Sequence, residues 1–276
     1  MKIGIVGLGL IGGSLGLSLK NEKLISCVSG MDLSKEHEKQ AIELGLVHEI
    51  LTIEQMKQKC DMIFLAIPVE AIIKIVKEFE GIGKNTTIVD LGSTKQKIIE
   101  AVPESIRQNF IPAHPMAGTE YSGPTAAFSG LFKDAVVAIC DFKESGEMHV
   151  KRSVELFSHL GMKIIFMSAA EHDHHASVIS HLPHAISFSL ASSVLKKENK
   201  KNIIALSGTG FNGMIRIAKS SPVMWTDIFK QNKQNLINSI DLFKKELDEC
   251  ENLIKNEKWD ELREWMGEAR KIREIL

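Results

Sequence analysis

Hydrophobic residues in the first 167 positions of the chain gather in short runs that have the length of β-strands. Six such runs are apolar at most successive positions: 3–6, 25–31, 62–67, 87–91, 135–140 and 163–166. Strands that are apolar on both faces are typical of parallel sheets covered by helices. Between the runs, apolar residues fall at helical spacing in three segments: 35–44, 70–79 and 148–160. This alternation predicts βαβ units and a doubly wound parallel sheet.

The pattern changes after Met167. The rest of the chain contains no convincing strand, but apolar positions recur at helical spacing in three long segments: 179–195, 236–254 and 259–275. Turn-forming residues separate them at 207–213 and 220–222. We therefore predict two domains, residues 1–167 with the sheet and residues 168–276 with helices alone. A helical domain of this size can cover a cleft and pair two copies of the chain.

Composition narrows the classes of protein that fit this pattern. Of the 276 residues, 44% are hydrophobic and 25% are charged, which is ordinary for a globular protein of two domains. The net charge of −1 provides no basic footprint, so we expect neither nucleic acid nor a membrane as a partner. No apolar run approaches the ~18 residues that span a bilayer. The apolar N-terminus has no small-residue cleavage site before Lys20, so it does not read as a secretion signal.

The first strand runs directly into a glycine turn, Gly7-x-Gly9-x-x-Gly12, and a helix follows from Ile11 to Lys20. In this context the first glycine allows the tight turn, the second allows close approach of a pyrophosphate, and the third allows the helix to pack on the strand. The helix N-terminus then offers unpaired N–H groups to the phosphates. The turn therefore predicts a dinucleotide site in a Rossmann-type domain, although a glycine turn without a ligand would look the same.

Asp32 lies 20 residues after Gly12, at the end of the second strand. An acid at this distance accepts hydrogen bonds from the adenine ribose hydroxyls, and its charge repels the 2′-phosphate of NADP. The alternative is that Asp32 caps the helix that begins at Ser34, a role that Ser34 can take itself. We expect NAD as the cofactor, with Leu10, Ile11, Ile67 and Ser93 beside it.

Three further segments carry chemistry: Asp90–Lys95 after a strand, His114–Glu120 with Pro and Gly in its loop, and the histidine-rich stretch from Glu171 to His184. An imidazole near neutrality suits a general base that takes the proton of an alcohol while hydride leaves its carbon. From spacing alone, His114 is as well explained as an ordinary loop residue.

Metal-ligand patterns are not evident. The histidine stretch has no H-E-x-x-H motif, and consecutive histidines on a helix point in several directions, so we expect no metal. Asp173 instead fits a helix cap or a substrate pocket. The four cysteines form no C-x-x-C pair, which predicts neither a zinc ribbon nor a disulfide framework. A reducing, cytoplasmic location is the default expectation.

Taken together, these segments resemble the prephenate dehydrogenase family over essentially the whole chain. The resemblance is carried by five motifs: GLGLIGGSL, DLGSTK, HPMAGTE, SHLPHAISFSLA and GFNGMIRIAKSSPVMW. It implies an enzyme that uses NAD to decarboxylate prephenate oxidatively to 4-hydroxyphenylpyruvate in tyrosine biosynthesis. It also implies a helical C-terminal domain that forms a homodimer.

The resemblance assigns catalytic roles by position. His114 is expected to accept the hydrogen bond and proton of the prephenate 4-hydroxyl, and Ser93 to orient that hydroxyl. Asp173 is expected to fix the tautomer of a histidine, with His114 as the favoured partner. The resemblance also implies five residues at the substrate: Arg216, His184, His181, Glu120 and Trp225.

The chemistry of the substrate agrees with an arginine in this set. Prephenate carries two carboxylates, and the planar guanidinium fork matches a carboxylate in bidentate fashion. Arg216 lies between Ile215 and Ile217, where an unpaired charge would be costly, although a surface position is the alternative. Many family members have an acid three positions before this arginine, where this chain has Gly213. Its absence favours prephenate over arogenate weakly, because the arogenate ammonium would lack that partner.

Two other classes of protein stay open at this point. A β-hydroxyacid dehydrogenase has a similar domain order and needs a lysine in its helical domain, for which Lys219 is conceivable. A non-catalytic NAD-binding sensor would keep Gly7, Gly9, Gly12 and Asp32 but would have no use for the histidine and arginine motifs.

Overall fold

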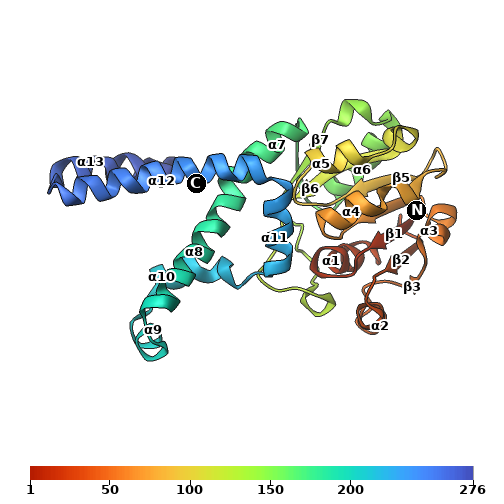
Figure 1. Ribbon diagram of the computed structural model, residues 1–276. Coiled ribbons are helices and arrows are strands. Elements are labelled where there is room, and N and C mark those ends of the chain that lie inside the picture. The colour runs from red at the N-terminus through yellow and green to blue at the C-terminus, as the bar shows by residue number, and fades with distance from the viewer. Residues whose placement is uncertain (276) are drawn as a thin grey trace. The chain divides into compact units, whose positions relative to one another are not determined.

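The computed structural model describes residues 1–275 (Figure 1). The chain forms two compact units, and the boundary between them lies after Asn232. The first unit holds an eight-stranded sheet in the order β3-β2-β1-β4-β5-β6-β7-β8. Its strands are β1 (Lys2–Val6), β2 (Cys27–Met31), β3 (Glu49–Ile50), β4 (Met62–Leu65), β5 (Thr87–Asp90), β6 (Phe110–Pro115), β7 (Val136–Cys140) and β8 (Lys163–Met167).

Helices cover both faces of this sheet, because successive strand residues point to opposite sides. On β4, Phe64 belongs to the core under α1 and α6, whereas Ile63 belongs to the core under α3, α4 and α5. The covering helices are α1 (Leu10–Leu19), α2 (Lys35–Glu43), α3 (Ile53–Lys59), α4 (Val69–Ile75), α5 (Gln96–Ala101) and α6 (Glu147–His159). The α/β fold with a doubly wound, mostly parallel sheet is therefore confirmed.

Two strands depart from the predicted parallel order. β7 runs antiparallel to β6, and β8 is parallel to β7. A parallel return after β6 would need a crossover helix, but the connection between them contains only a short 3₁₀ turn, Pro124–Ala126. As a result, the loop after His114 stays at the carboxyl edge of the sheet. His114 itself lies within β6 and not in the loop that follows it.

The remainder of the first unit is helical. Its elements are α7 (Ala169–Ala176), a π-helical turn η5 (Ser177–His181), α8 (Leu182–Lys197), α9 (Lys200–Leu206), α10 (Thr209–Ile215), a 3₁₀ turn η6 (Arg216–Lys219) and α11 (Pro222–Gln231). The described part of the chain has no strand after β8, as predicted. The turn expected over 207–213 is wrong beyond Gly208, since α10 begins at Thr209. The domain boundary placed after Met167 stays a prediction.

The continuous helical run Ala169–Lys197 is long and apolar enough to cross a membrane by length and composition, which counting apolar runs in the sequence missed. Its most apolar window has a mean hydropathy of 1.3, and 11% of that window is buried within this chain. It is the only such run among residues 1–275.

The second unit is a pair of helices, α12 (Lys233–Lys255) and α13 (Trp259–Ala269), drawn in blue in Figure 1. Glu257 in the connection has a φ of 53°, a left-handed conformation that reverses the chain in three residues. The indole N–H of Trp265 donates to the Glu246 carboxylate at 3.2 Å, which ties the two helices together.

The glycine turn shows why α1 can lie so close to β1. A Cβ at Gly12 would lie 1.9 Å from the Gly7 carbonyl oxygen, and a Cβ at Gly16 would lie 2.2 Å from that of Leu46. Gly7 has a φ of 96°, which side chains other than glycine rarely adopt. Gly9 differs, because a Cβ there would have no neighbour within 4 Å. Gly7 and Gly12 are thus required by packing, and Gly9 keeps a surface open.

This difference predicts that two alanine substitutions lower stability by unequal amounts. Gly12→Ala should lower the free energy of unfolding by about 1–3 kcal/mol, because the added methyl group overlaps backbone atoms. Gly9→Ala, the matched control, should lower it by less than about 1 kcal/mol. Urea denaturation followed by circular dichroism measures both, and equal losses would show that the close packing of α1 is not the constraint.

Candidate active site

A pocket of about 600 Å³ opens at the carboxyl ends of β1, β4, β5 and β6. Ligands bind along this edge in doubly wound sheets. Eleven of the predicted site residues line the pocket: Gly9, Leu10, Ile11, Ile67, Ser93, His114, Glu120, His181, His184, Arg216 and Trp225. Four others are not part of the lining: Gly7, Gly12, Asp32 and Asp173.

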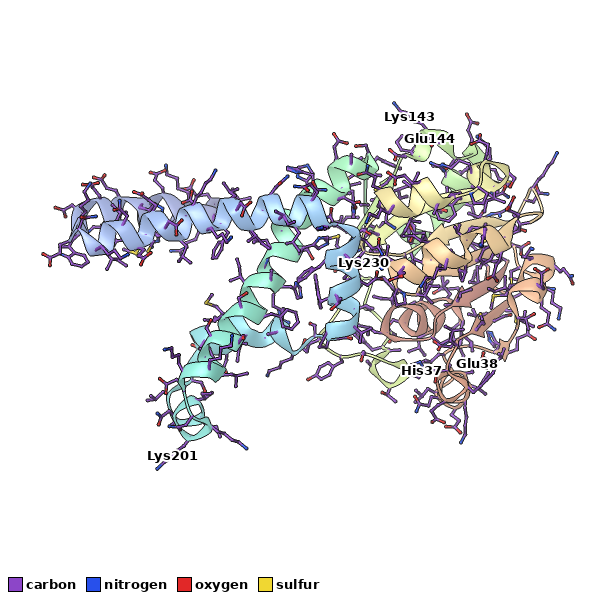
Figure 2. All side chains as sticks on the ribbon, in the orientation of Figure 1. His37, Glu38, Lys143, Glu144, Lys201 and Lys230 are labelled. Carbon is purple, nitrogen blue, oxygen red and sulfur yellow. The ribbon has the colours of Figure 1, made fainter. Side chains whose placement is uncertain are left out.

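Asp32 supports the glycine turn from the end of β2. Its carboxylate accepts the Leu8 N–H at 2.8 Å and the Ser34 N–H at 2.9 Å. The cap of α2 is Ser34, whose hydroxyl accepts the His37 N–H at 3.3 Å, so Asp32 is not needed for that role. His37, labelled in Figure 2, lies 3.4 Å from the Asp32 carboxylate. The side chain of Asp32 is therefore fixed beside the turn and keeps lone pairs for another donor.

His114 is buried on β6 and reaches the lining of the pocket. Its Nδ1 lies 2.8 Å from Nε2 of His172, and Nδ1 of His172 lies 2.8 Å from Oδ1 of Asp173. Asp173 therefore contacts His172, and it reaches His114 only through this intermediate ring. The direct contact between Asp173 and His114 that we favoured is wrong. The ring of His172, the neighbouring residue on α7, lies between them.

Burial is the main influence on the protonation of His114. It lowers the pKa of this imidazole well below its usual value, and the neighbouring positive charges of His172, Lys95 and His181 lower it further. His114 is consequently neutral near pH 7 and able to accept a proton.

Asp173 also fixes the loop that carries Ser93. Its carboxylate accepts the backbone N–H of Lys95 at 2.8 Å and of Gln96 at 3.0 Å, at the start of α5. It thus caps a helix, but that helix is distant in sequence and not its own. Ser168 caps α7, with Glu171 completing the capping box. Burial opposes ionisation of Asp173, but the hydrogen bonds from His172, Gln96 and Lys95 hold its pKa below the usual value.

A buried ion pair lies under the same loop. The Lys95 ammonium contacts the Asp90 carboxylate, and neither side chain is exposed to solvent. Lys95 also donates to the Ala113 carbonyl oxygen at 2.7 Å, next to His114. Burial raises the pKa of Asp90, and the positive charge of Lys95 opposes that shift. The pair connects the ends of β5 and β6.

The π-helical turn between α7 and α8 shifts the helix register in the middle of the site. Such turns are frequent at functional sites. Without an extra residue per turn, positions 173 and 181 would drift apart around the helix. Here Asn232 reaches both, donating to the Asp173 carbonyl oxygen at 2.6 Å and lying 3.2 Å from Nδ1 of His181. Burial lowers the pKa of His181 to about 4.

His184 and Trp225 form a flat wall of the pocket. Their rings stack with centroids 3.5 Å apart. Nδ1 of His184 lies 2.9 Å from the Ser180 carbonyl oxygen, so it donates and leaves Nε2 as an acceptor. The buried Trp225 Nε1 has no hydrogen-bond partner among residues 1–275. Both histidines of the SHLPH motif thus line the pocket, and an unpaired indole donor lies beside them.

Arg216 lies at the rim. Its guanidinium is 3.4 Å from the Glu120 carboxylate, and its side chain is 59% exposed. The expectation of an apolar environment is therefore wrong, because α10 and η6 place the flanking isoleucines at only intermediate burial. Gly213 is exposed on α10, and a Cβ there would meet nothing within 4 Å. Lys219 is exposed and is not part of the lining.

Three residues were missed or given no role in the sequence analysis: His172, Lys95 and Asn232. A lysine five residues after a strand-ending aspartate is a usable signal for the ion pair. The other two have no local signal for their roles, because the contacts of His172 with His114 and of Asn232 with Asp173 and His181 join residues 51 to 59 positions apart. Across residues 1–275, no group of three or more His, Cys, Asp or Glu side chains is placed to hold a metal ion.

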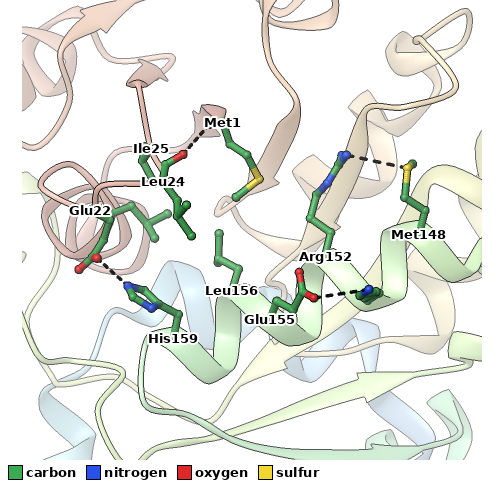
Figure 3. A pocket seen from close by; sticks show the side chains of 11 residues that line it. Met1, Glu22, Leu24, Ile25, Met148, Arg152, Glu155, Leu156 and His159 are labelled. Carbon is green, nitrogen blue, oxygen red and sulfur yellow. Dashed lines mark hydrogen bonds and ion pairs between the residues drawn. The ribbon is translucent and has the colours of Figure 1, made fainter.

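A second pocket, of about 460 Å³, lies near the amino ends of β1 and β2 (Figure 3). It is walled by Leu24, Ile25 and Leu156, and its rim carries the Glu22–His159 contact at 2.6 Å. None of the predicted site residues lies there.

The fold and the pocket define a dinucleotide-binding α/β protein with a buried histidine at the carboxyl edge of its sheet. Residues 15–166 match the nucleotide-binding domain of prephenate dehydrogenase, and residues 168–268 match its dimerization domain. This chain belongs to the prephenate dehydrogenase family and is an oxidoreductase of that family.

Individual relatives agree with this assignment. The prephenate dehydrogenase of Bacillus subtilis is 32% identical over 99% of this chain and 75% of its own length. The cyclohexadienyl dehydrogenase of Zymomonas mobilis is 31% identical over 99% of this chain and 95% of its own. The crystal structure of the A. aeolicus prephenate dehydrogenase with hydroxyphenyl propionate and NAD+ has a TM-score of 0.91 at 31% identity, and covers 99% of this chain and 97% of that one.

Removing one partner of the buried ion pair tests its role. Lys95→Met should lower the free energy of unfolding by about 3–5 kcal/mol, because it leaves the Asp90 carboxylate buried and unpaired. In that variant Asp90 folds most easily when protonated, so stability should fall as pH rises above ~4. Urea denaturation at several pH values measures this. Lys143→Met, at an exposed lysine labelled in Figure 2, is the control and should stay within ~0.5 kcal/mol of the wild type.

Proposed function

We propose that this protein catalyses the NAD-dependent oxidative decarboxylation of prephenate to 4-hydroxyphenylpyruvate, CO₂ and NADH in tyrosine biosynthesis. The observation that carries the proposal is the buried, neutral His114 in the same pocket as Ser93 and the glycine turn. Neither a β-hydroxyacid dehydrogenase nor a non-catalytic sensor accounts for this arrangement, since Lys219 is outside the pocket.

The residues around the glycine turn fit a dinucleotide. Gly9 leaves open space where a side chain would stand, and α1 begins there with no side-chain cap on its first amides. Those amides and the helix dipole favour a pyrophosphate. Asp32 presents a fixed carboxylate suited to ribose hydroxyls and unsuited to a 2′-phosphate. When bound, the nicotinamide supplies the acceptor for the hydride.

His114 and Ser93 act on the substrate hydroxyl. Nδ1 of His114 is occupied by His172, so Nε2 is the nitrogen available to the pocket. It accepts the hydroxyl proton as hydride leaves the same carbon. Loss of CO₂ then makes the ring aromatic, and the oxygen regains its proton because the product is a phenol. A base that is neutral at pH 7 and shielded from water suits both transfers.

The rim provides the charges that a dicarboxylate requires. Arg216 pairs with a substrate carboxylate, which replaces its long contact with Glu120. The unpaired Trp225 indole N–H is a further donor toward the substrate. The other carboxylate is held weakly, since it leaves as CO₂.

Arogenate is the second candidate substrate, for two reasons. A relative that is 31% identical is a cyclohexadienyl dehydrogenase, and Glu120 lines the pocket as a carboxylate that an ammonium could approach. Gly213 favours prephenate, because it supplies no carboxylate for the arogenate ammonium. Glu120 is then the one carboxylate in contact with Arg216 among the described residues.

A homodimer is part of the proposal. Large apolar side chains are exposed on the helices after β8: Ile179, Leu195, Ile204, Leu206 and Met214. The match of this region to a dimerization domain offers a second copy of the chain as the cover for this surface. The same surface accounts for the high hydropathy of the run Ala169–Lys197.

Turnover is tested by mixing the protein with NAD and either prephenate or arogenate and following NADH absorbance. We expect turnover with kcat/KM at least ~10-fold higher for prephenate, and His114→Asn should lower kcat by at least ~10² with little change in NAD binding. His159→Asn, at the pocket of Figure 3, is the control and should keep wild-type kcat. Silence with both substrates from folded protein that binds NAD would falsify the proposal.

Cofactor choice is tested at Asp32. Asp32→Asn keeps an acceptor for the Leu8 N–H but removes the charge that repels a 2′-phosphate. The preference for NAD over NADP should fall at least ~10-fold, equivalent to ~1.4 kcal/mol. Kd values for both cofactors from fluorescence titration give the ratio. Glu36→Gln, exposed on α2, is the control, and an unchanged ratio in Asp32→Asn would remove Asp32 from the ribose.

A further inference from the structure

Three buried side chains form an unbroken hydrogen-bonded chain from a carboxylate to the proposed base, which lines the pocket. Asp173 is 2% exposed, His172 3% and His114 9%. The two rings meet edge to face, with centroids 5.0 Å apart and planes at 73°. No other side chain bonds a ring nitrogen of His172 in the described residues. His172 is thus enclosed between the base and a carboxylate.

Proton counting assigns each nitrogen in this chain. The Asp173 carboxylate accepts the Lys95 and Gln96 amides and is ionised, so it can only accept from Nδ1–H of His172. In a neutral ring, Nε2 of His172 then carries a lone pair. The 2.8 Å contact with His114 therefore requires that Nδ1–H of His114 donates. Nε2 of His114 is left unprotonated, in the form that a base must have.

The opposite arrangement would inactivate the site. If His172 carried a proton on Nε2 before the reaction, it would donate to Nδ1 of His114 and force the His114 proton onto Nε2. Nε2 could then no longer accept the substrate proton. The tautomer of His114 thus depends on the proton position in His172, which the Asp173 carboxylate determines.

We propose that His172, held by Asp173, is a positioning residue that keeps the His114 proton on Nδ1 and receives it during turnover. This inference rests on the proposed role of His114. As the substrate O–H bond breaks, an N–H bond forms at Nε2 of His114. The Nδ1–H bond then breaks and one forms at Nε2 of His172, beside the Asp173 carboxylate. A bound nicotinamide would accept the hydride, and both proton shifts reverse when the product oxygen regains its proton.

Stabilisation of the resulting charge explains why a second histidine is useful. A cation on His114 would face Lys95 and His181 without a carboxylate in contact. The same charge on His172 lies 2.8 Å from Asp173. The titratable groups around this chain are Asp173 and His172 on α7, His181 on the π-helical turn, Asp90 and Lys95 at the end of β5, and Cys140 on β7.

The pH profile of His172→Gln tests the inference. A glutamine oxygen can still accept from Nδ1–H of His114, but it cannot take the proton or carry its charge. We expect kcat to fall at least ~10-fold, and the acid limb of kcat/KM to move to lower pH, because the accepted proton can no longer pass to a ring beside the Asp173 carboxylate and the protonated base loses that stabilisation. His174→Gln, exposed on the same helix, is the control. A uniform loss at all pH values with an unmoved limb would indicate a structural role only.

The tautomer can be read without any turnover. NMR of the ¹⁵N-histidine-labelled wild-type protein with NAD should show His114 and His172 both protonated at Nδ1, and Asp173→Asn should shift the His114 proton to Nε2. An Nε2 proton on His114 in the wild type would overturn the inference whatever the substrate is. Absence of turnover with the expected tautomers would instead overturn only the proposed function.

Discussion

The Asp173 carboxylate is the interaction on which the rest of the site depends. It joins α7 to the loop after β5 across 77 and 78 residues of sequence, by accepting two backbone amides. That contact fixes Ser93 at the pocket and pins the start of α5. The same carboxylate orients His172, and through it His114. Position and protonation of the site are therefore set by one buried anion, whose charge is stabilised by hydrogen bonds and not by a direct salt bridge to lysine.

Charge balance below the pocket follows from this arrangement. Two carboxylates and one lysine are buried there, and burial lowers the pKa of His114 and of His181. Asp90 and Lys95 compensate each other, so the Asp173 charge remains available to stabilise a cation on His172. A buried ion pair in such a place contributes little net stability over apolar residues, but losing one partner is costly. Its value here is positional, because it holds the ends of β5 and β6 together at the base.

Local pattern was sufficient for much of the fold. The glycine turn and the apolar runs at β1, β4 and β5 identified strands to within one or two residues, because side-chain period and turn chemistry are local properties. The direction of β7 could not be predicted from the sequence pattern. β7 pairs antiparallel with β6 because the connection between them has no crossover helix. Ser34 and Asp32 show the same difference. The helix cap by Ser34 is a local contact that the sequence analysis included. The hydrogen bond from the Leu8 N–H to Asp32 joins the ends of two strands and was not predicted.

The sequence by itself determined the chemical groups of the site: the glycines, Asp32, Ser93, His114 and the histidine-rich stretch from Glu171 to His184. Their motifs were enough to indicate the family. Only the tertiary structure decided how these groups act on one another. It placed His172 between Asp173 and His114, left Arg216 at the exposed rim, and used Lys95 to neutralise Asp90. Burial and hydrogen-bond geometry control protonation, and both depend on contacts between segments that are far apart in the chain.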